Sequence, residues 1–183
     1  MTPDAARRLL TEADKIHSAE SIDAAITRVA AEISGALAHA NPLVLCVMRG
    51  GTVFAGHLMT QLPFALEFDY ADVTRYGDAT SGGALQWRYL PETNASGRDV
   101  LLLDDILDEG ITLAALRDKL MAAGARRVWT AVLIDKVTGR AKSIGADFTG
   151  LTAPDRYVFG FGMDAHGYWR NLPAIYALKD SGQ

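Results

Sequence analysis

Four acidic side chains follow one apolar segment in the middle of the sequence. Residues 100–103 are Val-Leu-Leu-Leu, a run typical of a strand that is buried on both faces. Asp104 and Asp105 come directly after it, and Asp108 and Glu109 stand a few positions further on. Two adjacent carboxylates cannot both enter a core without a large desolvation cost. They suit ribose hydroxyls instead, or a hard cation such as Mg²⁺, which prefers oxygen ligands.

A phosphate site is expected immediately after these acids. Gly110 and Thr112 precede Leu113, where apolar residues begin to recur with helical spacing. The first backbone N–H groups of a helix have no partner within the helix, and they bind anions. Asp108 stands between the carboxylates for a sugar and this phosphate cradle, where it could take or give a proton. A simpler explanation is that the acids only cap the helix and stabilise its dipole.

The same order of strand, glycine turn and helix occurs earlier in the chain. Residues 43–48 form an apolar run, and Arg49, Gly50 and Gly51 follow it. A double glycine lets the backbone approach an anion closely, and Arg49 adds positive charge. A plain tight turn also accounts for these residues. In an open parallel sheet both turns would lie at the carboxyl ends of the strands, where ligands bind.

Two further segments carry candidate site residues. Residues 128–134 have the pattern of another buried strand, and Lys136 follows that strand closely. Its ammonium would point at the ligand crevice, or else into solvent. Residues 64–73 and 85–90 have strand patterns separated by a small, polar run, which favours a β-hairpin with a mobile lid. Such lids exclude water from reactive intermediates, although a disordered hairpin tip would have the same composition.

The two ends of the chain are less distinctive. Residues from about 4 to 40 have the pattern of two helices, the first including Ile16 and the second capped by Ser21. Near the other end, Tyr157, Asp164 and Arg170 provide an aromatic platform, a carboxylate and a guanidinium. A small hydrophobic core with charges at its edge would explain this group equally well.

Composition limits the classes of function. The chain has 183 residues, 49% of them hydrophobic and 22% charged, as expected for one globular domain with a full core. Its net charge of −4 does not favour nonspecific binding to nucleic acid or to a membrane. The single cysteine, Cys46, lies in an apolar run and is expected to be a buried hydrophobe. No segment resembles a signal peptide or a membrane span, so we expect a cytoplasmic protein.

Four motifs together resemble one enzyme family. VLLLDDILDEGITL resembles the motif that binds 5-phosphoribosyl-1-pyrophosphate (PRPP) in type I phosphoribosyltransferases. VMRGGTVFAGHLM resembles the pyrophosphate loop of that family, in which a cis peptide often occurs near Arg49, and LIDK resembles its purine lysine. PDRYVFGFGMDAHGYWRNLP resembles the purine hood of the 6-oxopurine branch, the hypoxanthine-guanine phosphoribosyltransferases. The resemblance implies an α/β fold with a mostly parallel central sheet flanked by helices and a small hood subdomain.

The resemblance also implies a division of the single domain 1–183. The core would span about 40–150, the hood would combine the N-terminal helices with about 151–183, and the lid would span about 74–86.

On the PRPP side, the resemblance implies a role for each residue of the central motif. Asp104 and Asp105 would bind the ribose, and the 5-phosphate would lie against Asp108, Glu109, Gly110, Ile111 and Thr112. Arg49, Gly50 and Arg170 would meet the pyrophosphate, and Tyr76 would belong to the lid. Ile111 stands where relatives often carry a polar or basic residue. Arg75 stands where a serine usually precedes the lid tyrosine, which leaves its role open.

On the base side, the resemblance implies that Lys136 donates to the exocyclic oxygen of a 6-oxopurine. Tyr157 would stack on the base, Val158 would contact it through its backbone, and Asp164 would lie beside them. Mg²⁺ is the implied cofactor, held by Asp104, Asp105 and Asp164. Asp108 would act as the general base on purine N7 and as the catalytic residue.

The implied activity is a purine salvage reaction. PRPP and hypoxanthine or guanine would give IMP or GMP and pyrophosphate, without nucleic-acid or membrane partners, in a homodimer or homotetramer. Three alternatives stay open: a transcriptional regulator of the same fold that binds PRPP or a nucleotide, a noncatalytic nucleotide-binding domain, and a phosphoribosyltransferase for another base such as xanthine. The net charge of −4 argues against an RNA-binding regulator.

Overall fold

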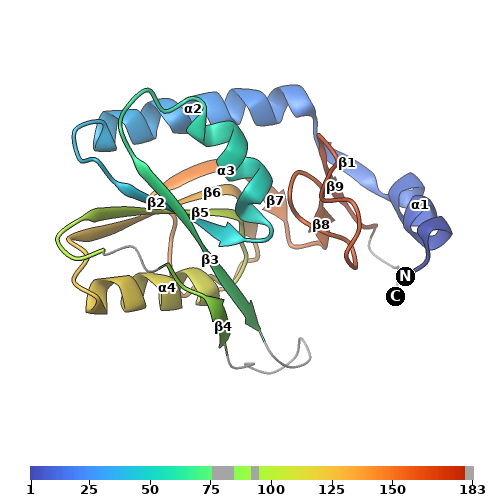
Figure 1. The fold of residues 1–183 in the computed structure, drawn as a ribbon. Coiled ribbons are helices and arrows are strands. Elements are labelled where there is room, and N and C mark those ends of the chain that lie inside the picture. The colour runs from blue at the N-terminus through green and yellow to red at the C-terminus, as the bar shows by residue number, and fades with distance from the viewer. Residues whose placement is uncertain (76–84, 92–94, 180–183) are drawn as a thin grey trace.

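The computed structural model describes residues 1–75, 85–91 and 95–179. Its centre is a six-stranded sheet in the order β4-β3-β2-β5-β6-β7, in which β4 is antiparallel to β3 and the other neighbours are parallel (Figure 1). The expected α/β fold with a mostly parallel sheet is confirmed. The strands are β2 (Leu43–Met48), β3 (Glu67–Arg75), β4 (Leu85–Tyr89), β5 (Asp99–Leu107), β6 (Arg127–Val137) and β7 (Phe148–Pro154).

Helices cover both faces of this sheet. Helices α2 (Ala19–Leu37) and α3 (Gly51–Met59) lie on one face, and α4 (Ile111–Ala122) lies on the other (Figure 1). Alternate residues of a strand point to opposite faces, so Val44 and Cys46 of β2 pack toward α2 and α3, whereas Leu45 packs toward α4. Burial on both faces explains why β2 and β5 are continuous apolar runs. The expected burial of Cys46 is confirmed.

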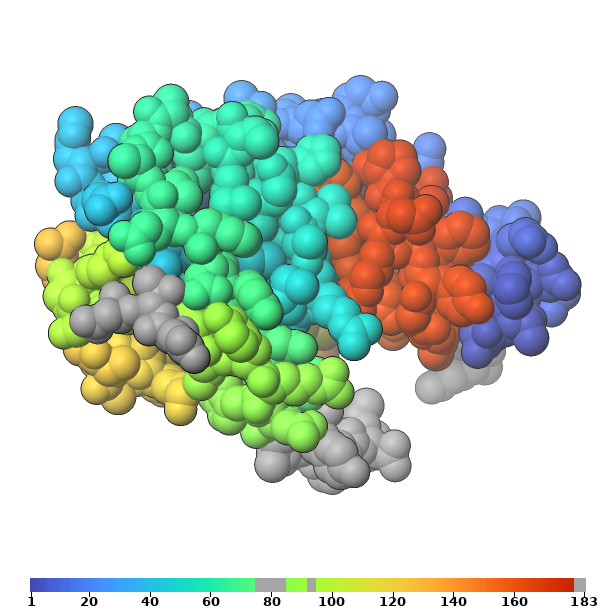
Figure 2. Space-filling model, in the orientation of Figure 1, coloured from blue at the N-terminus to red at the C-terminus, as the bar shows by residue number. Residues whose placement is uncertain are grey.

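A smaller sheet joins the two ends of the chain. Its order is β1-β9-β8, formed by β1 (Asp14–His17), β9 (Ile175–Ala177) and β8 (Val158–Phe159), and helix α1 (Pro3–Glu12) precedes it. Figure 2 shows the C-terminal segment between helix α1 and the body of the molecule. Arg156 Nη2 donates to Asp14 Oδ2 at 2.7 Å, and Trp169 Nε1 donates to the carbonyl of Ala6 at 2.9 Å. The division into core, hood and lid stays a prediction. Helix α2, one of the N-terminal helices assigned to the hood, packs on the larger sheet.

The N-terminal helices differ from the expectation. Helix α1 ends at Glu12, because Ala13 is extended (φ −78°, ψ 152°) and residues 14–17 pair with β9. Ile16 therefore belongs to a strand. Ser18, not Ser21, caps α2, since the Ser18 hydroxyl accepts a hydrogen bond from the Ser21 backbone N–H at 3.3 Å.

Strands β5 and β6 are longer than their apolar cores. Parallel pairing continues to Leu107 and Asp135, so Asp104 and Asp105 lie at the end of a strand and not in the following turn. Lys136 likewise lies within β6, not beyond it. The site residues of these segments are therefore held by the hydrogen bonds of a sheet. Within the described ranges no helix is both long and apolar enough to cross a membrane.

Candidate active site

The carboxyl ends of β5 and β6 face the C-terminal segment across a cavity of about 210 Å³. Residues that are far apart in the sequence line it: Asp105, Ile106 and Asp108 from the β5 end, Lys136 from β6, and Tyr157, Val158, Met163 and Asp164 from the C-terminal segment. The structure thus brings together two of the central acids, the lysine, the tyrosine and Asp164, whereas Asp104, Glu109 and Arg170 are not part of this lining. Ile106 and Met163 were missed, because an apolar residue in an apolar context gives no sign that it lines a pocket.

Asp108 and Lys136 form an ion pair in the lining of this cavity. Lys136 Nζ donates to Asp108 Oδ2 at 2.8 Å, and the lysine side chain is only 12% exposed. Asp108 Oδ1 is buried and has no hydrogen-bond partner among the described residues. A buried acceptor without a donor costs free energy. The Asp108 carboxylate would therefore gain a hydrogen bond by turning so that this oxygen meets an N–H group of a bound ligand.

Asp104 and Asp105 are close enough to influence each other's charge. Burial raises the pKa of both carboxyls, and the charge of Asp105 raises that of Asp104 further. The positive charge of Arg170 acts in the opposite direction and lowers the pKa of Asp105. A cation would relieve this repulsion, and Mg²⁺ commonly takes one or two carboxylates and completes its shell with waters and substrate phosphates. The oxygen donors fit Mg²⁺, although no group of three or more metal-binding side chains occurs in the part of the chain that the structure describes.

The turn after β2 packs tightly against these acids. The peptide between Met48 and Arg49 is cis, and Arg49 is exposed. A Cβ atom on Gly50 would lie 1.8 Å from Asp105 Oδ2, and one on Gly162 would lie 2.1 Å from the Gly50 carbonyl oxygen. Real atoms do not approach so closely, so a side chain at Gly50 would displace the Asp105 carboxylate. Gly162 requires glycine, because its Cβ would meet backbone and its φ is 103°. The turn is thereby held between β5 and the C-terminal segment.

Arg170 organises the C-terminal side of the cavity. Its Nη1 donates to the Gly162 carbonyl at 2.6 Å, and its Nη2 donates to Asp164 Oδ1 at 2.5 Å. Asp164 Oδ2 accepts from the Gly167 N–H at 2.6 Å, and the Tyr157 hydroxyl donates to the Asp164 carbonyl at 3.0 Å. Burial and the charge of Asp164 raise the pKa of Tyr157. The tyrosine is still 47% exposed, so part of its ring can contact a ligand.

A second cavity of about 210 Å³ lies beside the first, at the N-terminus of α4. Its lining is Asp108, Glu109, Ile111, Thr138, Arg140, Ala141 and Ser143. Gly110 has a positive φ of 75° and directly precedes the helix, which also contains Thr112. Helix N-termini bind anions. Four lining residues follow β6 and were not predicted to belong to the site: Thr138, Arg140, Ala141 and Ser143. Their sequence does not indicate the contact that brings them there, in which the Ser143 N–H donates to the Glu109 carbonyl at 2.9 Å.

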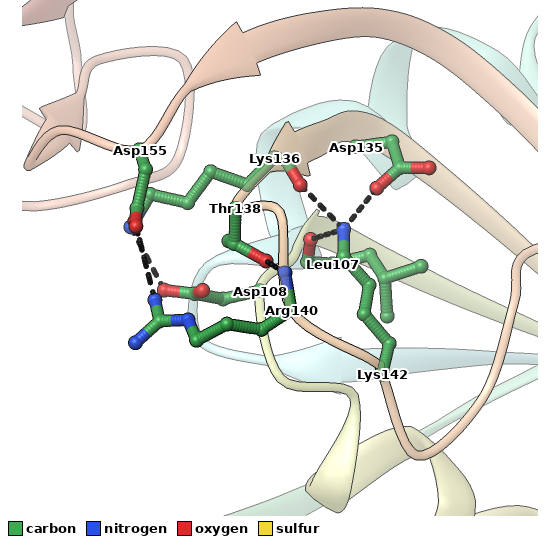
Figure 3. Close-up of polar contacts among 8 residues, drawn as sticks. All are labelled: Leu107, Asp108, Asp135, Lys136, Thr138, Arg140, Lys142 and Asp155. Carbon is green, nitrogen blue, oxygen red and sulfur yellow. Dashed lines mark hydrogen bonds and ion pairs between the residues drawn. The ribbon is translucent and has the colours of Figure 1, made fainter.

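Lys142 connects the ends of β5 and β6 (Figure 3). Its Nζ donates to the Leu107 carbonyl at 2.9 Å, to the Lys136 carbonyl at 2.6 Å and to Asp135 Oδ1. Leu107 directly precedes Asp108, and the other carbonyl belongs to Lys136 itself. Lys142 therefore holds the backbone next to both members of the ion pair. Lys142 was also missed, because a lysine in a polar loop is typical of a solvated surface. Tyr76, the expected lid residue, lies outside the described residues.

Comparison with known proteins identifies relatives of this arrangement. Residues 12–166 match the family model described as phosphoribosyl transferase domain. The hypoxanthine-guanine phosphoribosyltransferase of Bacillus subtilis is 35% identical over 88% of this chain and 91% of its own length. The hypoxanthine-guanine-xanthine phosphoribosyltransferase of Tritrichomonas foetus is 34% identical over 91% of each chain.

A solved structure shows the same fold. A hypoxanthine phosphoribosyltransferase from Staphylococcus aureus superposes with a TM-score of 0.85 at 26% identity, over 91% of each chain. The family match covers most of the chain, and the curated relatives align over nearly their whole length. The chain therefore belongs to the phosphoribosyltransferase family, in the branch of the hypoxanthine-guanine enzymes.

Proposed function

We propose that this protein transfers the 5-phosphoribosyl group of PRPP to hypoxanthine or guanine. The products are IMP or GMP and pyrophosphate, and the reaction depends on Mg²⁺. The observation that carries this proposal is the pair of Asp108 and Lys136. It offers one acceptor without a partner and one ammonium in a cavity that Tyr157 borders. A 6-oxopurine presents the complementary groups, an N–H at N7 and an oxygen at C6.

The base is bound and deprotonated by side chains of this cavity. Tyr157 stacks on the purine, the Val158 backbone contacts its edge, and Lys136 donates to the C6 oxygen. Asp108 Oδ1 accepts the hydrogen bond from N7–H and takes the proton as N9 attacks C1 of the ribose. The bond between C1 and the pyrophosphate oxygen breaks while the bond to N9 forms. General-base catalysis of this kind contributes about 10²- to 10⁴-fold.

The PRPP half occupies the adjacent surface. The 5-phosphate lies at the N-terminus of α4, against the backbone of residues 109–112, and Asp104 and Asp105 hold the ribose hydroxyls. The leaving pyrophosphate develops negative charge, which Arg49 and Arg170 stabilise. Bound Mg²⁺ would supply further neutralisation of phosphate charge. Asp104, Asp105 and Asp164 are the residues that we expect to hold it.

The first test is Asp108→Asn. Asparagine keeps the shape of the side chain but cannot accept the N7 proton, so we expect kcat to fall by about 10²-fold or more with little change in the KM for PRPP. Asp118→Asn is the matched control, because Asp118 is 71% exposed on α4 and pairs only with Arg117 in the described structure. Turnover by Asp108→Asn equal to that of Asp118→Asn would refute the assignment of the base.

The range of bases separates the remaining functions. Offering hypoxanthine, guanine, xanthine, adenine and uracil with PRPP and Mg²⁺ measures specificity directly. A relative named for xanthine as well as hypoxanthine and guanine keeps xanthine as a second candidate substrate. PRPP binding without product from any base would indicate a regulator of the same fold. A lid that includes Tyr76, a cytoplasmic location and a homodimer or homotetramer remain predictions from the family resemblance.

A further inference from the structure

Lys136 lies between two carboxylates, and only one of them has a role in the proposed reaction. Its Nζ is 2.8 Å from Asp108 Oδ2 and 3.7 Å from Asp155 Oδ1. The first carboxylate is at the end of β5, and the second follows β7 in the C-terminal segment. Asp155 was not singled out in the sequence, where it is one acid among several near a turn.

Asp155 is in turn held by Arg140. The Arg140 Nη2 donates to Asp155 Oδ2 at 3.1 Å and to Oδ1 at 3.4 Å (Figure 3). The backbone N–H of Arg140 donates to the Thr138 hydroxyl at 3.2 Å, which orders the start of the loop after β6. Asp155 is therefore fixed from one side by a cation and offers its charge to Lys136 on the other.

Catalysis requires Lys136 to exchange partners. Because Asp108 Oδ1 is buried, the carboxylate must turn away from Lys136 to meet N7–H, and it loses its charge once the proton arrives. Lys136 must meanwhile donate to the C6 oxygen. A buried ammonium without a carboxylate is costly, so a second carboxylate at the same site lowers the cost of the exchange.

We propose that Asp155, anchored by Arg140, is a positioning residue that holds Lys136 toward the C6 oxygen when Asp108 turns to N7. The inference rests on the proposed transfer to a 6-oxopurine. Asp155 touches neither substrate and acts through Lys136. The carboxylate of the nearby Asp135 is paired with Lys142 instead.

The central variant is Asp155→Asn, compared with Asp118→Asn and with the conservative Asp155→Glu. We expect its KM for hypoxanthine to rise about 5- to 10-fold, a moderate effect because Asp155 is 43% exposed and partly screened. The KM for PRPP and the melting temperature stay within the range of Asp118→Asn. Asp155→Glu restores at least half of the lost affinity. Arg140→Met changes the same KM in the same direction by a smaller factor.

Two measurements distinguish positioning from a structural role. Unsubstituted purine has no oxygen at C6, so its inhibition constant should change less than twofold in Asp155→Asn. In a Lys136→Met background, Asp155→Asn should have no further effect on the KM for hypoxanthine. Equal losses for purine and hypoxanthine, or an undiminished effect in the Lys136→Met background, would overturn the inference. Absence of any transfer by the wild-type protein would instead overturn the proposed function.

Discussion

The contact between Gly50 and Asp105 supports a prediction whose size follows from the structure. Gly50 has helical dihedral angles (φ −60°, ψ −45°), so alanine is conformationally allowed there and only space is at issue. The added Cβ would lie 1.8 Å from Asp105 Oδ2 and 2.4 Å from Cγ. Relief of the clash requires a displacement of more than 1 Å. We therefore expect Gly50→Ala to move the Asp105 carboxylate or the whole turn after β2.

The expected loss is large in activity and moderate in stability. Overpacking of this kind costs about 1–3 kcal/mol, and a misplacement of about 1 Å at a reacting centre can cost about 10²-fold in rate. The kcat/KM for PRPP, measured at saturating hypoxanthine, should fall by roughly this factor. Thermal denaturation measures the change in stability.

Gly56→Ala is the matched control for this prediction. Gly56 lies in helix α3, which begins directly after Gly50, and a Cβ at Gly56 would meet nothing within 4 Å. Alanine in a helix interior is more stable than glycine by about 0.5–1 kcal/mol, so this variant should melt slightly higher and keep full activity.

A double-mutant cycle tests the cause. In an Asp105→Ala background the carboxylate is absent, so Gly50→Ala should no longer destabilise the protein. Equal kcat/KM for Gly50→Ala and Gly56→Ala would refute the reasoning, and so would a destabilisation by Gly50→Ala that persists in the Asp105→Ala background.

Two further predictions concern charged residues of the site. Because the pKa of Asp104 is raised in the folded state, the folded protein binds more protons than the unfolded one, and stability falls as the pH rises above the ordinary value of 3.8. Asp104→Asn should therefore raise the melting temperature at neutral pH without Mg²⁺, by an amount that shrinks toward acid pH; a lower melting temperature would contradict this. Lys142→Met should lower the free energy of unfolding by about 2–3 kcal/mol, since three acceptors lose their donor, and it should also reduce kcat. Thermal or urea denaturation measures the change in stability. Lys179→Met, at an exposed position, is the control and should change neither stability nor kcat.

Much of the architecture followed from local patterns. The apolar runs in β2 and β5 could be recognised because a strand buried on both faces needs them, and the glycines and acids that follow mark the ends of such strands. Asp108, Lys136 and Tyr157 were singled out by residue type and motif. The convergence of Asp108 and Lys136 could be expected, since the carboxyl ends of parallel strands share an edge, whereas Tyr157 was expected there only from the family resemblance.

Other features depended on contacts between distant segments. Residues 14–17 form a strand only because β9 pairs with them, and no local period predicts that partner. Asp104 and Asp105 lie in β5 because pairing with β6 continues beyond the apolar core. The contact of Gly50 with Asp105 depends on how closely the turn after β2 approaches strand β5.

By itself, the sequence determined the buried strands and the acids and lysine that follow them, because strand burial and residue chemistry are local properties. The arrangement of the sheet and the role of the tyrosine came from the resemblance of its motifs to a family. Tertiary structure decided the second carboxylate beside Lys136, the support from Lys142 and the close approach of Gly50 to Asp105. Each of these depends on distances between side chains and backbone from different elements. Such distances are set by packing, which no single segment of the sequence specifies.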